Sequence, residues 1–279
     1  MKKRIACALA VLAVVVFVAS CSEKVTDEAA IRALVEQDTT YFKSGTQGDS
    51  AAGGGLLDDT MVGLWWRGPQ THDPQARIEV EVVGDSAWVS WHQSNYGELF
   101  HWVATSESTA ERWIKELVER VQLNAFFLRE GEATETNRGW RFKRLSLAFG
   151  HSDTVNTVRI DSLRIQSSLR DFVIRDPLNV YYSPDSLVSF TPGELLTMTL
   201  YTNTEDCFAF LHAFAGWLFV RVPFEHQGDG VHVGTWHAQI IPGFRFAIFD
   251  LLSTGTLLER EGPYDHNGWL LPYMIETAD

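Results

Sequence analysis

The chain has 279 residues, of which 45% are hydrophobic and 21% are charged, values typical of a globular protein of about two domains. Acidic residues outnumber basic ones by 36 to 23, and the formal net charge is −13. Because no basic patch is evident, the composition argues against nucleic acid as a partner.

The first twenty residues have the pattern of a secretory signal. Three basic residues precede an apolar run at positions 5–18, which is too short for a stable membrane span. The small residues Ala19 and Ser20 then lead directly to Cys21. This order resembles the lipobox of bacterial lipoproteins. The resemblance implies that residues 1–20 are removed and that Cys21 is lipidated on its thiol and its new amino terminus.

The expected mature protein is tied to a membrane by its lipidated terminus, with residues 21–26 as a short tether. Several acyl chains anchor a protein stably, whereas a single chain binds only marginally. Ser22, in place of an aspartate, resembles the signal for outer-membrane localisation, so we expect an outer-membrane lipoprotein of the bacterial cell envelope. A plain secretory signal with a chance cysteine is the alternative. If Cys7 leaves with the signal and Cys21 is lipidated, Cys207 is the one remaining thiol, and its apolar neighbours favour a buried side chain.

Residues 27–150 predict a first domain that mixes helix and strand. Thr26 is a good N-cap for a helix that reaches about Phe42. The capping-box pattern at Ser108, followed by apolar residues at helical spacing, predicts a second helix at 109–120; strand that begins already near Val118 is the alternative. Strands are expected at 61–66, 77–83, 125–129 and 140–149.

The stretch from Gly84 to Val103 is densest in aromatic residues and histidines, and its strand propensity predicts the central hairpin of a curved sheet. Successive side chains of a strand point to opposite faces, so only one of two sets can line a cavity. One set is Trp88, Ser90, His92 and Ser94, and the other is Ala87, Val89, Trp91 and Gln93.

Four features in order resemble the SnoaL-like branch of the nuclear transport factor 2-like (cystatin-like cone) superfamily. They are Tyr41-Phe42 at the end of the first helix, Asp58-Asp59 before a strand, the run Val83–Ser90, and Gly139–Leu145 near the end. The resemblance covers residues 27–150 and implies an α+β cone, in which a helix covers a curved antiparallel sheet around a pocket. The chain departs from it where glycines replace a second helix and in an extra segment, Thr105–Glu119.

Residues 156–279 predict an all-β sandwich, because short strands alternate with turn signals. Pro192-Gly193-Glu194 and Pro242-Gly243, each before a strand, resemble bacterial immunoglobulin-like domains in architecture. The expected fold class is therefore an α+β cone followed by an all-β sandwich.

The pocket of the expected cone would be lined by Tyr41, Trp65, Trp88, His92, Tyr96 and His101. In enzymes of this superfamily, a pocket base removes a proton next to a carbonyl while nearby donors hold the oxyanion. The resemblance would make His92 or Asp59 the base and Tyr96 the donor. We favour the alternative that these side chains only cap a loop and line a wall, because no spacing among them is diagnostic.

Three histidines of the second half, His226, His232 and His237, invite a metal interpretation. The odd spacing of the last two would place them on opposite faces of one strand, so we expect no metal and no cofactor. Asp229-Gly230 is typical of a turn that needs positive φ.

The expected function is non-catalytic binding of a small apolar or aromatic ligand or of an envelope protein, by a lipoprotein held at the membrane. Two alternatives stay open. One is a small-molecule isomerase, dehydratase or hydrolase that uses the pocket, and the other is a structural component of the envelope.

Overall fold

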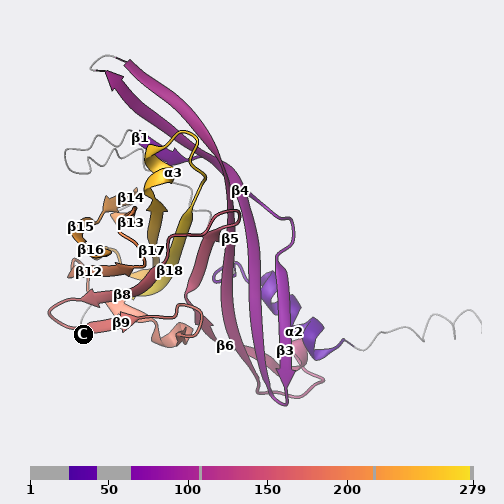
Figure 1. Ribbon diagram of the computed structural model, residues 1–279. Coiled ribbons are helices and arrows are strands. Elements are labelled where there is room, and N and C mark those ends of the chain that lie inside the picture. Colours follow the sequence, from indigo (N-terminus) through magenta and orange to yellow (C-terminus); the bar gives the residue numbers. More distant parts are fainter. Residues whose placement is uncertain (1–24, 43–63, 107–108, 216–217, 277–279) are drawn as a thin grey trace, which may run out of the picture.

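The computed structural model describes residues 25–42, 64–106, 109–215 and 218–276. Most of these residues lie in antiparallel strands of two sheets (Figure 1). The predicted lipidation site Cys21 and the predicted base Asp59 lie outside the described residues, as do the signal and the glycine-rich loop. Within the described part of the chain, no helix is long and apolar enough to cross a membrane.

The larger sheet runs through both halves of the chain. Its main order is β1-β4-β5-β7-β18-β17-β13-β14, with five more strands pairing at its sides. Its strands are β1 Leu64–Arg67, β2 Thr71–His72, β3 Arg77–Val83, β4 Ser86–Ser106, β5 Thr109–Arg129, β6 Trp140–Ser146, β7 Ala148–Ser152, β10 Tyr181–Tyr182, β11 Val188–Phe190, β13 Cys207–Ala215, β14 Leu218–Pro223, β17 Gly243–Ser253 and β18 His266–Ile275.

The smaller sheet has the order β15-β16-β12-β8-β9. It faces β13, β17 and β18 of the larger sheet across an apolar core that includes Leu163, Leu200 and Phe249. Its strands are β8 Ile160–Gln166, β9 Asp171–Ile174, β12 Leu195–Thr202, β15 Glu225–Gly228 and β16 Val231–His237, and short helices lie at η1 Thr136–Gly139, η2 Pro184–Ser186 and α3 Thr254–Leu258. The predicted turn at Asp229-Gly230 is confirmed, since both residues have positive φ (53° and 68°).

The predicted cone followed by a sandwich is wrong, because the chain is mostly β and one sheet continues from its first half into its second. The junction is formed by β7, which pairs with β5 on one side and with β18 on the other. The division into segments 27–150 and 156–279 stays a prediction.

The first helix is shorter than predicted. α2, Asp27–Gln37, begins at Thr26, whose Oγ1 accepts a hydrogen bond from the backbone N–H of Ala29 at 3.1 Å. It ends before Tyr41 because the Asp38 carboxylate accepts hydrogen bonds from three successive backbone N–H groups, including those of Tyr41 and Phe42, and this favours a turn over further helix. α2 buries Ile31 and Val35 against the sheet, in an apolar cluster that includes Val89 and Trp91 of β4.

The predicted helix at 109–120 is wrong, because this segment is the first half of β5. β4 and β5 are 21 residues each and pair along their whole length, so the hairpin is roughly 70 Å long. Burial in β5 has period two. Trp113, Lys115 and Leu117 are buried, while Arg112, Ile114 and Glu116 are exposed. The long pairing with β4 therefore prevails over the local helical pattern.

One face of this hairpin contacts two different parts of the molecule. Near the start of β4, Val89 and Trp91 pack beneath α2, whereas Leu99, farther along the same face toward the β4–β5 turn, packs in a cluster with Leu257 of α3. Because β-ribbons twist, one face can rotate from one side to the other along such a length. Figure 1 shows α2 and α3 on opposite sides of the hairpin.

Candidate functional site

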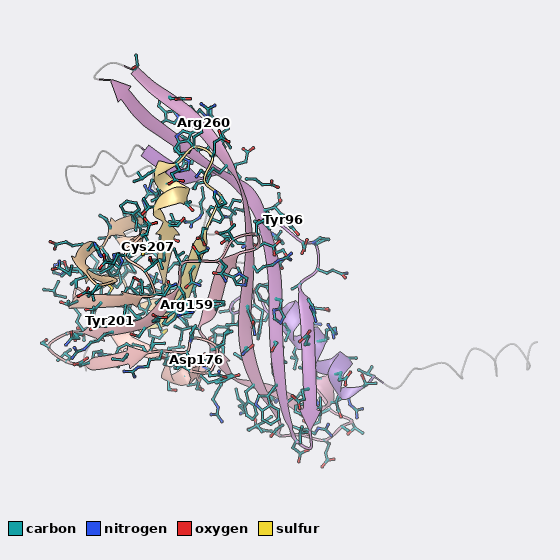
Figure 2. All side chains as sticks on the ribbon, viewed as in Figure 1. Tyr96, Arg159, Asp176, Tyr201, Cys207 and Arg260 are labelled. Carbon is teal, nitrogen blue, oxygen red and sulfur yellow. The ribbon has the colours of Figure 1, made fainter. Side chains whose placement is uncertain are left out.

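The structure does not bring the six predicted pocket side chains to one place. Tyr41 packs against the rings of Phe142 and Phe244 beside α2. Trp88, His92 and Tyr96 follow one another on the outward face of β4, at intervals of roughly 13 Å. Trp88 is 43% exposed and Tyr96, whose hydroxyl bonds Asp73, points away from the body of the protein (Figure 2). Trp65 and His101 do meet, as opposed and buried residues of β1 and β4.

The predicted catalytic residues do not form a catalytic pair. His92 lies beside Glu79 and Arg77, and its pKa is lowered, mainly by burial. Tyr96 is four residues farther along the strand and contacts Asp73 instead. His101 is also poorly suited to accept a proton, since burial and then the charge of Lys115 lower its pKa to about 4.

The histidines of the second half are divided between two places. The rings of His226 and His232 are tilted by 33° with centroids 4.9 Å apart, and His232 Nε2 lies 3.5 Å from the Sγ of Cys207. His237 instead contacts the carbonyl of Gly193. Burial lowers the pKa of His232 to about 4 and raises that of Cys207 to about 11, so both groups are neutral at pH 7. Among the described residues, no group of three side chains is arranged to hold a metal ion.

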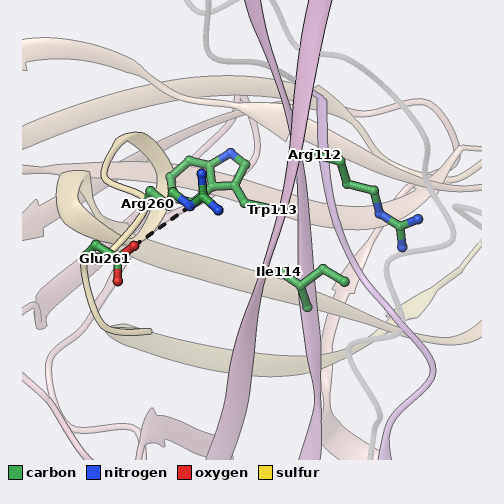
Figure 3. A pocket seen from close by; sticks show the side chains of 5 residues that line it. All are labelled: Arg112, Trp113, Ile114, Arg260 and Glu261. Carbon is green, nitrogen blue, oxygen red and sulfur yellow. Dashed lines mark ion pairs between the residues drawn. The ribbon is translucent and has the colours of Figure 1, made fainter.

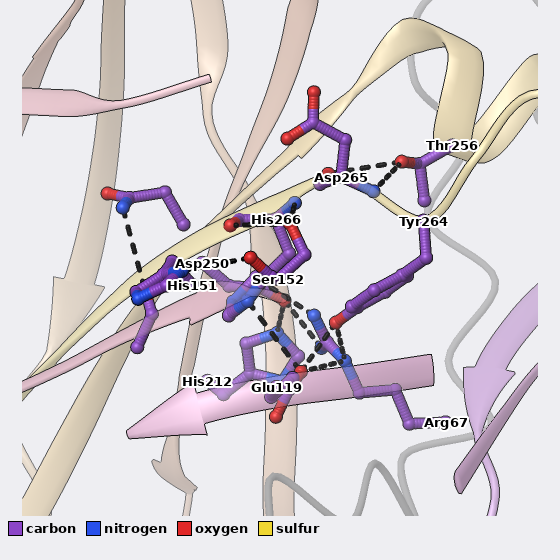
Figure 4. Close-up of polar contacts among 12 residues, drawn as sticks. Arg67, Glu119, His151, Ser152, His212, Asp250, Thr256, Tyr264, Asp265 and His266 are labelled. Carbon is purple, nitrogen blue, oxygen red and sulfur yellow. Dashed lines mark hydrogen bonds and ion pairs between the residues drawn. The ribbon is translucent and has the colours of Figure 1, made fainter. Parts of the chain in front are cut away.

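A buried polar network, missed by the sequence reasoning, joins the hairpin to the rest of the larger sheet (Figure 4). Arg67, at the end of β1, makes two parallel hydrogen bonds to the Asp250 carboxylate, at 2.7 and 3.0 Å. Its Nε donates to the Tyr264 hydroxyl at 3.1 Å, and that hydroxyl donates to Glu119 of β5 at 2.5 Å. The network therefore connects β1 and β5 to β17 and to the segment before β18.

Two imidazoles complete the network around Asp250. His212 Nε2 lies 2.9 Å and His266 Nε2 lies 3.0 Å from the carboxylate oxygens. Burial alone would raise the pKa of Asp250, but Arg67 and both histidines hold it well below its usual range. All of these side chains are buried, so a substrate cannot reach them in this arrangement. The network acts as a polar connection inside the sheet, where each charge has a partner.

The sequence carries one signal for this network. Asp250 interrupts the apolar run from Phe246 to Leu252, and a carboxylate at a buried strand position needs a partner. The pattern does not identify that partner, because Arg67 lies 183 residues away along the chain.

The half of the hairpin far from α2 carries an exposed aromatic surface. We call it the distal aromatic face and define it as Trp66, Phe100, Trp102 and Ile114, which share one side of β1, β4 and β5. Trp102 is 47% and Ile114 is 48% exposed. Trp66 stacks on Phe100 with ring centroids 5.2 Å apart, and the Arg112 guanidinium lies 5.0 Å from the Phe100 ring.

The distal aromatic face is supported by close contacts on both sides of the sheet. Gly68 lies so close to Phe100 that a Cβ there would be 2.5 Å from a ring carbon. On the inner side of the same strands, Trp113 packs between His101 and the Nζ of Lys115. Lys115 in turn donates to the carbonyl of Gly255 in α3 at 2.7 Å.

A cavity of about 530 Å³ lies beside this part of β5. It is lined by Arg112, Trp113 and Ile114 of the strand and by Arg260 and Glu261 of the segment after α3 (Figure 3). Arg260 also pairs with Glu111. The cavity is open and its lining is mainly charged, so it lacks the enclosed apolar wall of a small-molecule pocket.

Comparison with known proteins does not assign the chain to a family. No protein-family model matches the chain, and no curated protein is significantly similar to it.

Proposed function

We propose that the protein is a lipid-anchored component of the bacterial cell envelope that binds a protein partner through the distal aromatic face, without catalysis. One observation carries the proposal: Trp102 and Ile114 are nearly half exposed at the end of the hairpin that lies away from α2. Contiguous exposed aromatic and apolar residues in a water-soluble fold are a common mark of an interaction surface.

The composition of this face suits a protein more than a small molecule. Tryptophan, phenylalanine and arginine are enriched where proteins bind one another, and they supply most of the binding energy there. The stack of Trp66 on Phe100, with Arg112 beside it, is already ordered, so little side-chain entropy would be lost on binding. A small ligand would instead need an enclosed cavity, whereas Ile31, Val35 and Trp91 beneath α2 pack in one apolar cluster.

The ionisable groups also support binding over catalysis. A general base must reach its substrate, but the carboxylates and imidazoles of the network around Asp250 are buried. The exposed face offers Arg112 and aromatic rings, which recognise a partner and do not transfer protons at neutral pH.

The anchor and the binding surface would lie at separate ends of the molecule. The tether proposed from Cys21 leads within a few residues to α2, and α2 covers the part of the hairpin where β4 begins and β5 ends, away from the turn that joins them. At the usual rise per residue, Trp88 and Trp102 are roughly 45 Å apart along β4. A partner could therefore occupy the distal face without meeting the lipid anchor.

A photo-crosslinking amino acid tests the binding surface. It would replace Trp102 in the full-length chain, in membranes of the expressing bacterium. The control replaces Trp88, which is equally exposed on the same side of β4. We expect a discrete product containing a second protein from position 102 and not from position 88. Equal labelling from both positions, or none from 102, would contradict the proposal.

Fractionation tests the anchor separately. Cys21→Ala should release the protein from membranes, and unchanged retention would contradict lipidation.

A further inference from the structure

The outer edge of β5 is open over part of its length. β4 pairs with one side of β5 throughout, while β7 and β6 cover the other side only from Glu119 onward. In the part of the chain that the structure describes, no strand pairs with that side between Glu111 and Leu117. The same stretch of β4 is covered, since β1 pairs with residues 99–102. An open edge exposes backbone N–H and C=O groups that can pair with another strand.

This edge is ordered and has room beside it. Trp113 and Lys115 are fixed on its inner side by His101 and by the carbonyl of Gly255. The cavity of about 530 Å³ borders the edge at Arg112, Trp113 and Ile114 (Figure 3). A further strand could therefore approach without reshaping the edge.

Two exposed charged residues in this part of β5 have no oppositely charged partner among the described residues. Arg112 contacts the Phe100 ring but has no carboxylate partner among the described residues, and Glu116 has no cationic partner among them. Both lie on the outer side of β5, with Ile114 midway between them. The segment reads Arg-Ile-Glu on this side, so its charges are opposite at its two ends.

We propose that this edge pairs with the same edge of a second copy of the chain, antiparallel about a two-fold axis at Ile114. In that register Arg112 faces Glu116 of the second copy and Glu116 faces its Arg112, while the two Ile114 side chains meet. Directly opposed residues of an antiparallel pair lie on the same face of the sheet. The register between the two β5 strands can therefore change only in steps of two residues. A shift to the neighbouring register would place Ile114 opposite Glu116 or Arg112, and both ion pairs would be lost.

The pairing would join two hairpins into one continuous sheet. A two-fold axis perpendicular to the sheet keeps both distal aromatic faces on the same side. The two α2 helices would then lie at the outer ends of the joined sheet, since the two β5 strands run antiparallel. The pairing shares Ile114 with the distal aromatic face but does not use Trp66, Phe100 or Trp102, so its test at position 114 is separate from the test of the proposed partner at position 102.

Cysteine crosslinking of the full-length chain in its membranes tests the register. Ile114→Cys should give a disulfide-linked dimer with copper phenanthroline, because the two Cα atoms would be directly opposed. Trp88→Cys is the matched control, exposed on the same side of β4 near α2, and should stay monomeric. Arg112→Cys and Glu116→Cys should crosslink to each other when coexpressed, and only weakly alone.

Charge-reversal variants then distinguish the proposed pairing from disulfides that form by random collision of two chains. Arg112→Glu and Glu116→Arg, each added to Ile114→Cys, should lower the dimer yield about tenfold, and the two together should restore it. Circular dichroism confirms that each variant is folded. A monomeric Ile114→Cys protein would overturn the proposal. So would a crosslink to a different protein, or equal yields from all charge variants.

Discussion

The buried pair of Arg67 and Asp250 gives the sharpest stability prediction. Arg67→Met removes both hydrogen bonds to the carboxylate, at 2.7 and 3.0 Å, and leaves Asp250 charged, with only imidazoles beside it. Breaking one side of a buried pair commonly costs about 3–5 kcal/mol, because the remaining charge stays out of water. We expect the free energy of unfolding to fall by about this amount.

A double-mutant cycle measures the part of this cost that belongs to the pair. Asp250→Asn alone should also destabilise the fold, since the buried Arg67 then keeps its hydrogen bond to Tyr264 but has Glu119, at 3.5 Å, as its one carboxylate partner among the described residues. The double variant should lose roughly 2–3 kcal/mol less than the sum of the single variants. Urea unfolding of the chain from Ser22 onward, followed by tryptophan fluorescence, gives each value.

The chain offers a matched control with the same geometry at the surface. Arg164 also makes two hydrogen bonds to one carboxylate, that of Asp171, at 2.9 and 2.6 Å, but both side chains are exposed. The cycle of Arg164→Met and Asp171→Asn should give a much smaller coupling than the buried cycle, because water screens the exposed pair. Equal coupling in the two cycles would refute the argument that burial makes the Arg67 pair essential.

Three further predictions concern Asp27 in the first turn of α2 and two residues that support the distal aromatic face, Gly68 and Lys115. Burial would raise the pKa of Asp27, but hydrogen bonds from Arg138, Trp140 and Arg129 lower it to about 2. Its carboxylate therefore stabilises the fold above about pH 4, and this contribution is lost as the pH falls toward 2. Asp27→Asn should cost about 2 kcal/mol at pH 7 and remove this dependence in thermal unfolding; an unchanged pH profile would contradict it. Gly68→Ala should lower the stability by about 1–3 kcal/mol, because the new methyl group displaces Phe100. Gly97→Ala is its control, since the nearest atom to a Cβ there is the Cγ of Gln70 at 3.0 Å and the nearest backbone atoms are 3.6 Å away, and equal losses would count against the packing argument. Burial lowers the pKa of Lys115 to about 8, so the unfolded chain holds more protons between pH 8 and pH 10 and stability should rise with pH there. Lys115→Met should flatten that rise in urea unfolding, and an equally steep rise in the variant would contradict it.

Local features of the sequence predict the parts of the fold that depend on near neighbours. The strand at 77–83 and the turn at Gly84-Asp85 are confirmed, because alternation and turn chemistry act over a few residues. The division of the next strand into two faces is also confirmed, since Val89 and Trp91 are buried and Trp88 is exposed.

The helix predicted after Ser108 shows where local signals fail. Its apolar residues fit a helix almost as well as a strand, since Trp113 and Leu117 are four apart and also an even number apart. The choice is made by β4, which offers a partner along the whole of β5. Such pairing, and the sheet that continues from β7 to β18, depends on contacts between residues far apart in the chain.

The candidate site could be predicted only in part. The aromatic density around Trp102 is visible in the sequence, but whether those rings are buried depends on the twist of the hairpin and on the position of α3. Trp91 and Trp102 lie on opposite faces of β4, and the first is buried while the second is exposed; alternation separates the two faces but does not say which one is buried. The network around Asp250 is harder still, because its members come from five separate segments.

Hydrogen–deuterium exchange tests most directly whether the distal half of the hairpin is a binding surface. The full-length protein would be measured in membranes of the expressing bacterium and after purification in detergent. A bound partner should slow exchange in membranes at residues 96–102 and 111–117 and leave residues 86–92 unchanged. Identical exchange of the distal half in the two samples would contradict the account.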